Sequence, residues 1–238
     1  IEAMRALAYV TAAALDNAHQ NPDAAARAQA QAFADLMIPV VKGWGTESSI
    51  DIASLGVQVH GGMGYIEETG AAQHLRDARI TTIYEGTTAI QANDLIGRKI
   101  AREKGATVNA VIGEMRTAAA GLDGDLALIG SRQLAAVDAL ERAVLWIVAN
   151  FASDPKAVHA GAVPFLHLFG IVAGGWQMGR MAVIARARIT AGDGDPFWPA
   201  KLATTRFFAD HFLTQAAGLA ESVIGGATGA LEMADDSF

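Results

Sequence analysis

The sequence has no cysteine, and that absence removes several kinds of chemistry. Its 238 residues can hold no disulfide, cysteine-ligated zinc, iron–sulfur cluster or thiol nucleophile. Apolar runs are short as well, and none reaches the roughly 18 residues of a spanning helix. The longest, 162–175, is interrupted by Pro164, His167 and three glycines. We therefore expect no membrane span. We also expect no metal site, because these histidines are not at metal-ligand spacing: His60, His74, His159, His167 and His211.

Positive charge is also in short supply. Lys and Arg number 18 against 25 Asp and Glu, which gives a net charge of −7. The basic residues are scattered, whereas duplex-binding modules present a basic face, so we expect no nucleic-acid partner. The first residues show neither a signal-peptide pattern nor a starting Met. We expect a cytoplasmic protein, of which this chain is one part.

Helix-forming residues are what the sequence does contain. Ala, Leu, Met, Gln and Arg dominate, and alternating β-branched runs are scarce. The prediction is an all-α fold, a helical bundle followed by a second helical domain, with residues 1–104 and 105–238 as the two domains. Pro39 is expected to kink or end a helix, and Gly43-Trp44-Gly45 to interrupt one. Helices are predicted at about 2–19, 24–44, 46–59, 70–76, 87–104, 108–122, 126–151, 156–190 and 199–224.

One break between predicted helices is rich in glycine. It reads Gln58-Val59-His60-Gly61-Gly62-Met63-Gly64-Tyr65. Glycine has no Cβ, so its backbone can approach a ligand closely. Exposed N–H groups in such a loop can cradle a phosphate or a ring edge. Glycine also punctuates ordinary turns, so by itself this loop leaves both interpretations open.

A second break, Ile83-Tyr84-Glu85-Gly86-Thr87, places a carboxylate just before a helix. An apolar environment would make that carboxylate a usable general base near neutral pH. N–H groups at the start of the helix could hold a carbonyl oxygen. The alternative is that Glu85 is a simple capping acid. Upstream, Arg76-Asp77-Ala78-Arg79 is interpreted as an ion-pair and capping network that fixes the loop before Glu85.

The stretch GVQVHGGMGYIEETGAAQHLRDARITTIYEGTTAIQANDLIGRK, residues 56–99, resembles the C-terminal region of acyl-CoA dehydrogenases. FLHLFGIVAGGW at 165–176 and AKLATTRFFADH at 200–211 are similar to the extra helical domain of the family's long bacterial members. The resemblance therefore covers essentially the whole chain, strongly in 56–99 and more loosely elsewhere.

The resemblance implies an FAD-dependent enzyme that dehydrogenates an acyl-CoA thioester between its α and β carbons. Glu85 matches the family's base, which removes the α-proton while the β-hydrogen leaves as a hydride to flavin N5. In some relatives the base lies on an earlier helix. The backbone N–H of Glu85 and a flavin hydroxyl would stabilise charge on the thioester oxygen. Tyr84 and Gly86 match positions that line the acyl and thioester pocket, where a Cβ at Gly86 would crowd the substrate.

The resemblance also implies a cofactor and partners. Thr87 matches a flavin-contacting position. A loop that contacts the adenosine half of FAD from a neighbouring subunit is matched by Gln58, Val59, His60, Gly61 and Gly62. The implied partners are the acyl-CoA substrate, an electron-transfer flavoprotein as electron acceptor, and further copies of the chain in a dimer or tetramer.

Several parts of a complete family member are missing from this sequence. These are the N-terminal helical domain, the β-barrel domain and the R-x-x-F-G segment that holds the FAD phosphates. We therefore expect the 238-residue chain to bind FAD weakly and to be inactive by itself. A second hypothesis is a non-catalytic helical module for assembly or interaction, derived from the same fold.

Overall fold

The computed structural model describes residues 1–237, so Phe238, the last residue of the predicted second domain, lies outside the described residues. Helix makes up 84% of the chain and no strand occurs within 1–237, which confirms the all-α prediction. The helices are α1 (Glu2–Gln20), α2 (Ala24–Val59), α3 (Gly62–Tyr65), α4 (Ala71–Thr81), α5 (Thr88–Asp94), α6 (Ala106–Ala120), α7 (Ala127–Asn150), α8 (Pro155–Ala160), α9 (Ala162–Thr190), α10 (Phe197–His211), α11 (Ala216–Gly225) and α12 (Ala227–Leu231). A π-helical segment occupies Leu95–Ala101, and short 3-10 turns lie at Glu67–Thr69, Gly124–Leu126, Leu213–Gln215 and Asp235–Ser237.

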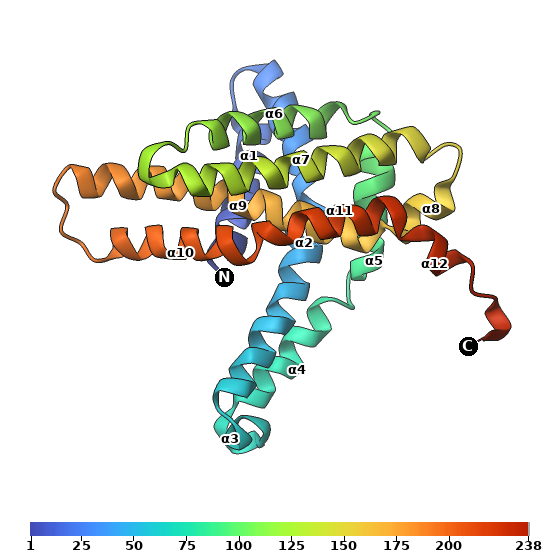
Figure 1. Ribbon diagram of the computed structural model, residues 1–238, viewed down its shortest axis with the longest axis horizontal. Helices are drawn as coiled ribbons and strands as arrows, with labels where there is room; N and C mark the ends of the chain where they lie inside the picture. The colour runs from blue at the N-terminus through green and yellow to red at the C-terminus, as the bar shows by residue number, and fades with distance from the viewer. Residues whose placement is uncertain (238) are drawn as a thin grey trace.

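The molecule consists of a body and a projecting arm (Figure 1). In the body, α6, α7, α9, α10 and α11 pack against one another, and α1 and the first part of α2 pack onto α9. The arm is the second part of α2 paired with α4, and α3 lies at its tip. The short helix α5 leads from the arm back to the body. The glycine-rich segment 58–65 therefore lies before α4, and the segment 83–87 that contains Glu85 follows it.

The predicted interruption at Gly43-Trp44-Gly45 is wrong, because α2 runs unbroken through it and through Pro39. Trp44 lies directly against α9, where a Cβ atom on Gly170 would come within 2.1 Å of the Trp44 ring. A Cβ on Gly43 would likewise come within 2.5 Å of Leu166. The rigid Trp44 ring leaves no space for a side chain at Gly170, whereas at Gly43 the atom in the way is the end of a leucine side chain. This close packing also stabilises a helix that proline and glycine would locally weaken.

Several other predicted boundaries differ from the structure. Helix α4 continues to Thr81 instead of ending near 76, and α3 occupies part of the predicted glycine-rich loop. The helix predicted at 156–190 is divided at Gly161, where α11 passes so closely that a Cβ would lie 3.0 Å from the Val223 carbonyl oxygen. The helix predicted at 199–224 is divided by the 3-10 turn Leu213–Gln215, because Leu213 turns into the core.

The helix predicted at 87–104 consists of α5 and the π-helical segment that follows it. Leu95, Ile96 and Ile100 of that segment are fully buried. The Arg102 N–H donates to the Gly97 carbonyl at 3.1 Å, the wider spacing that defines a π-helix. The chain then bends at Gly105, whose φ is +79°.

One hydrophobic core joins the residues on both sides of Gly105. Leu36, Met37 and Trp44 from α2 belong to the same buried cluster as Phe165 and Phe169 from α9. Helix α9 contacts α1, α2 and α5 as well as α6, α7, α10 and α11. The division into domains 1–104 and 105–238 stays a prediction, and any such domains share a core.

Helix α9 is long and apolar, yet the described residues show no clear membrane span. By length and composition it could cross a bilayer, since an 18-residue window has a mean hydropathy of 1.3. The search for an uninterrupted apolar run missed it because glycines divide the stretch. Of that window, 78% is buried inside the protein. Its apolar residues therefore form the core of the bundle.

Candidate functional site

Residues 82–87, here called the Glu85 turn, connect α4 to α5. Glu85 has a φ of +53°, in the left-handed region that non-glycine residues seldom adopt, and Gly86 follows with a φ of +90°. Strain of this kind is often retained at functional sites. The residue that caps α5 is Thr87, whose Oγ1 accepts a hydrogen bond from the Ile90 N–H at 3.4 Å. The interpretation of Glu85 as the capping acid of α5 is therefore wrong.

Lys42 of α2 reaches across to the Glu85 turn. Its Nζ donates hydrogen bonds to three carbonyl oxygens, those of Thr81 at 3.0 Å, Tyr84 at 2.9 Å and Gly86 at 2.7 Å. The same Nζ lies 5.5 Å from the centre of the Tyr84 ring. The backbone on both sides of Glu85 is thereby fastened to α2. Sequence reasoning missed Lys42 because its partners are backbone atoms on a distant segment.

Glu85 is an exposed residue whose carboxylate and backbone N–H are unpaired in the described part of the chain. Within residues 1–237, its carboxylate has no hydrogen-bond or ion-pair partner, and the N–H groups of Glu85, Gly86 and Thr87 donate to no protein atom. Glu85 is exposed, and Tyr84 is 49% exposed. The apolar enclosure expected around Glu85 is thus not supplied by the described residues. What they supply is an accessible carboxylate beside free backbone donors.

Gln91 and Thr88 tie α5 to its surroundings. Gln91 Nε2 donates to the Glu85 carbonyl at 3.5 Å, and a Cβ on Gly86 would lie 2.8 Å from that Nε2. Within this chain, the close neighbours of such a Cβ are therefore Gln91 and Ile90. Thr88 Oγ1 donates to the Glu47 carboxylate on α2. The Glu85 turn is consequently held to α2 from both ends.

The predicted FAD loop lies at the tip of the arm. All five of its predicted contact residues are exposed, namely Gln58, Val59, His60, Gly61 and Gly62. Gly61 has a φ of +61°, and the space that a Cβ on Gly61 or Gly62 would occupy is open. Helix α4, whose 11 residues span about 16 Å, lies between this tip and the Glu85 turn. The structure therefore does not bring the loop and the Glu85 turn together within one chain.

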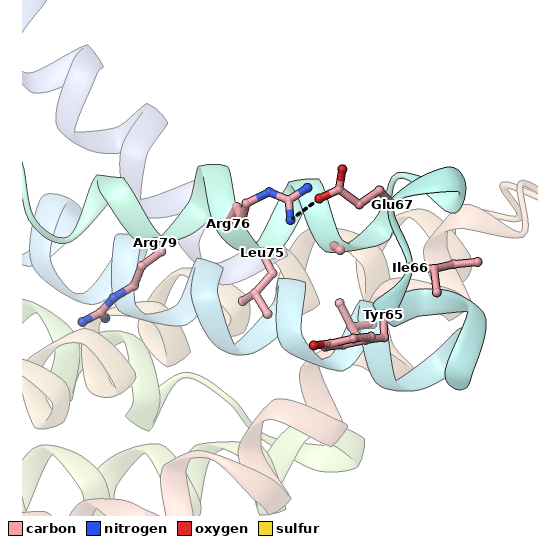
Figure 2. Close-up of a pocket in the computed structure, with 8 residues that line it drawn as sticks. Tyr65, Ile66, Glu67, Leu75, Arg76 and Arg79 are labelled. Atoms are coloured by element: carbon pink, nitrogen blue, oxygen red, sulfur yellow. Dashed lines mark ion pairs between the residues drawn. The ribbon is translucent and has the colours of Figure 1, made fainter.

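Figure 2 shows a groove of about 670 Å³ between the arm helices near the tip. Its lining combines apolar side chains with two guanidinium groups: Val57, Tyr65, Ile66, Glu67, Ala72, Leu75, Arg76 and Arg79. Arg76 pairs with Glu67 at 3.3 Å, the contact drawn as a dashed line. Arg76 also donates to Gln73 at 2.8 Å. Of the residues in the predicted network, only Arg76 forms an ion pair within residues 1–237, whereas Asp77 accepts a hydrogen bond from Gln73 at 2.7 Å. These contacts join residues of the arm and do not reach the Glu85 turn.

Two family models match the chain. Residues 1–100 match "acyl-CoA dehydrogenase, C-terminal domain", and residues 107–234 match "acetyl-CoA dehydrogenase C-terminal like". A 3-methylmercaptopropionyl-CoA dehydrogenase from Ruegeria pomeroyi is 47% identical over 90% of this chain. A broad-specificity linear acyl-CoA dehydrogenase from Mycobacterium tuberculosis is 35% identical over 75% of it. A butyryl-CoA dehydrogenase from Syntrophomonas wolfei is 26% identical over the full chain. The chain spans 37%, 31% and 40% of the lengths of these three relatives.

Proposed function

The chain belongs to the acyl-CoA dehydrogenase family, and on that basis we propose that it is the C-terminal part of an FAD-dependent enzyme that dehydrogenates acyl-CoA thioesters. The observation that carries the proposal is the Glu85 turn. A carboxylate held in a strained backbone conformation stands beside backbone N–H groups that no acceptor among residues 1–237 uses. A base and an oxyanion donor are the two groups that removal of an α-proton from a thioester requires.

Glu85 has two roles in this proposal. Its carboxylate takes the α-proton of the acyl chain. Its N–H donates to the thioester oxygen, where negative charge develops as the proton leaves. Tyr84 and Gly86 flank the substrate, and Gly86 leaves room beside the reacting atoms. Bound FAD would supply the acceptor for the β-hydrogen, which leaves as a hydride to N5.

The described residues suit FAD as two separate half-sites. Thr87 lies beside Glu85 and would contact the flavin half. At the arm tip, the open backbone of Gly61 and Gly62, with Gln58, Val59 and His60, would contact the adenosine half. The family resemblance implies that the adenosine half is contacted by a neighbouring subunit, so the arm of a second copy is proposed to complete each cofactor site. A homo-oligomer, dimer or tetramer, is therefore part of the proposal.

The proposed substrate class is acyl-CoA, and the proposed setting is fatty acid metabolism in the cytoplasm. Two relatives are named for short acyl groups, 3-methylmercaptopropionyl and butyryl, and one for linear acyl chains in general. These names support testing short and linear acyl-CoA thioesters first. An electron-transfer flavoprotein is the proposed electron acceptor. The chain taken alone is proposed to bind FAD weakly and not to turn over.

The test is Glu85→Gln in the complete flavoprotein. The substitution keeps the shape and backbone of the residue but removes the base. Steady-state turnover of butanoyl-CoA per bound flavin should fall by a factor on the order of 100 to 10,000, with flavin content unchanged. Glu114→Gln is the matched control, because Glu114 is an exposed glutamate on α6. Full turnover by Glu85→Gln would remove Glu85 from the role of base.

A non-catalytic module is the second candidate, and exposed apolar side chains at the arm tip favour it. Val59 is 85% exposed and Tyr65 is 82% exposed, which suits contact with another protein. Flavin in the purified complete protein separates the candidates. A purified complete protein that is colourless and does not take up added FAD would support the hypothesis of a non-catalytic module.

A further inference from the structure

We infer that Lys42 is a positioning residue that aims the Glu85 N–H at the thioester oxygen of the substrate. The inference rests on the proposed function, because it takes Glu85 as the base and its N–H as the oxyanion donor. Lys42 belongs to α2 and acts on the Glu85 turn through the backbone alone.

The contacts of Lys42 match its chemistry. A lysine ammonium has three N–H donors and no acceptor. Here the Nζ meets three carbonyl oxygens at 2.7–3.0 Å, those of Thr81, Tyr84 and Gly86. All of the donor capacity of Lys42 is therefore directed at the end of α4 and the turn that follows it.

Two of those contacts fix the direction of N–H groups in the Glu85 turn. A peptide unit is planar and trans, so its C=O and N–H point in opposite directions. The carbonyl of Tyr84 shares a peptide unit with the Glu85 N–H, and the carbonyl of Gly86 shares one with the Thr87 N–H. Because Lys42 holds both carbonyls toward α2, both N–H groups point away from α2. Neither donates to a protein atom within residues 1–237.

The charge of Lys42 adds to its geometric effect. A cation on the Tyr84 carbonyl polarises that peptide unit, and polarised hydrogen-bond chains strengthen one another. The Glu85 N–H is thereby made a stronger donor to a developing oxyanion. The left-handed backbone conformation of Glu85 also needs stabilising contacts from its surroundings. Lys42 provides them, because it donates hydrogen bonds to the carbonyls of the residues before and after Glu85.

A simple capping role would explain only part of this arrangement. Lysine often donates to the last carbonyls of a helix, and the contact with Thr81 is of that kind. The contacts with Tyr84 and Gly86 lie beyond the end of α4. Loss of a helix cap lowers the melting temperature and the amount of bound flavin. Loss of a positioning residue lowers kcat in molecules that are folded and have flavin bound.

The experiment compares Lys42→Met, Lys42→Arg and Lys156→Met in the complete flavoprotein. Lys156 is an exposed lysine on α8 and serves as the control. The quantities measured are bound flavin, melting temperature, KM for butanoyl-CoA and kcat per bound flavin. Lys42→Met should keep its flavin and its KM, while kcat per flavin falls on the order of 100-fold. Lys42→Arg keeps the charge and several donors, so it should recover part of the loss. Lys156→Met should match the unmodified protein.

The inference is overturned if kcat per bound flavin in Lys42→Met stays within about twofold of the unmodified protein. It is also overturned if only flavin content and melting temperature fall. Should Lys42→Met bind no flavin, Lys42→Gln takes its place, because the amide is uncharged and too short to reach all three carbonyls. A kcat per bound flavin within about twofold of the unmodified protein in Lys42→Gln would then overturn the inference. Glu85→Gln in parallel separates the two proposals. An inactive Glu85→Gln with a fully active Lys42→Met rejects the role of Lys42 alone, an active Glu85→Gln rejects Glu85 as the base, and a complete protein without flavin or turnover rejects the proposed function.

Discussion

At the scale of single residues, the backbone of Gly86 is the most constrained part of the Glu85 turn. Its φ of +90° disfavours any L side chain, and a Cβ would lie 2.8 Å from Gln91 Nε2. Gly86→Ala should therefore cost about 1–2 kcal/mol of unfolding free energy. Gly45→Ala is the matched control, because Gly45 lies inside α2 with no atom within 4 Å of its would-be Cβ. Chemical denaturation measures both, and equal stabilities would contradict the strain assigned to Gly86.

Local signals in the sequence predicted much at this scale. The break before the helix predicted at 87–104 placed Glu85 outside helix, as the structure has it. Lys42 could not be predicted in this way. Its three partners are backbone carbonyls, which carry no residue type, and they lie on a segment that only tertiary folding brings near α2.

At the scale of elements, α2 and α9 make a close contact through Trp44. Trp44 packs so closely on Gly170 that a Cβ there would lie 2.1 Å from the ring. Gly170→Ala should therefore overpack this contact and cost about 1–3 kcal/mol. Gly113→Ala, at an open position on α6, should be neutral or slightly stabilising because alanine favours helix. Thermal unfolding of the two variants tests the contact, and an unchanged melting temperature for Gly170→Ala would count against it.

The same contact explains why helix boundaries were the weaker part of the sequence prediction. Proline and glycine predicted a break where α2 is continuous, because burial of Trp44 against α9 outweighs their local preference. Conversely, Gly161 ends α8 within a stretch that reads as one helix, because α11 passes close to it. Residue composition predicted the helical class correctly, whereas the helix boundaries depend on tertiary packing.

At the scale of the whole molecule, the Glu85 turn and the arm tip lie at opposite ends of α4. If each cofactor site takes its flavin-side residues from one copy and its arm tip from another, defective subunits should complement each other. Glu85→Gln lacks the base, and Gly62→Trp fills the open backbone of the arm tip. Mixed oligomers of the two should regain part of the turnover that each lacks alone. The absence of any regained turnover in verified mixed oligomers would argue that one chain builds its site unaided.

The role of Glu85 is tested most directly by a single turnover without an electron acceptor. Excess butanoyl-CoA is mixed anaerobically with the complete flavoprotein, and loss of the visible flavin band is followed in the unmodified protein, Glu85→Gln and Glu114→Gln. Bleaching by Glu85→Gln should be slower by a factor on the order of 100 or more, while Glu114→Gln bleaches at the unmodified rate. Bleaching of Glu85→Gln at the unmodified rate would contradict the assignment of Glu85 as the base.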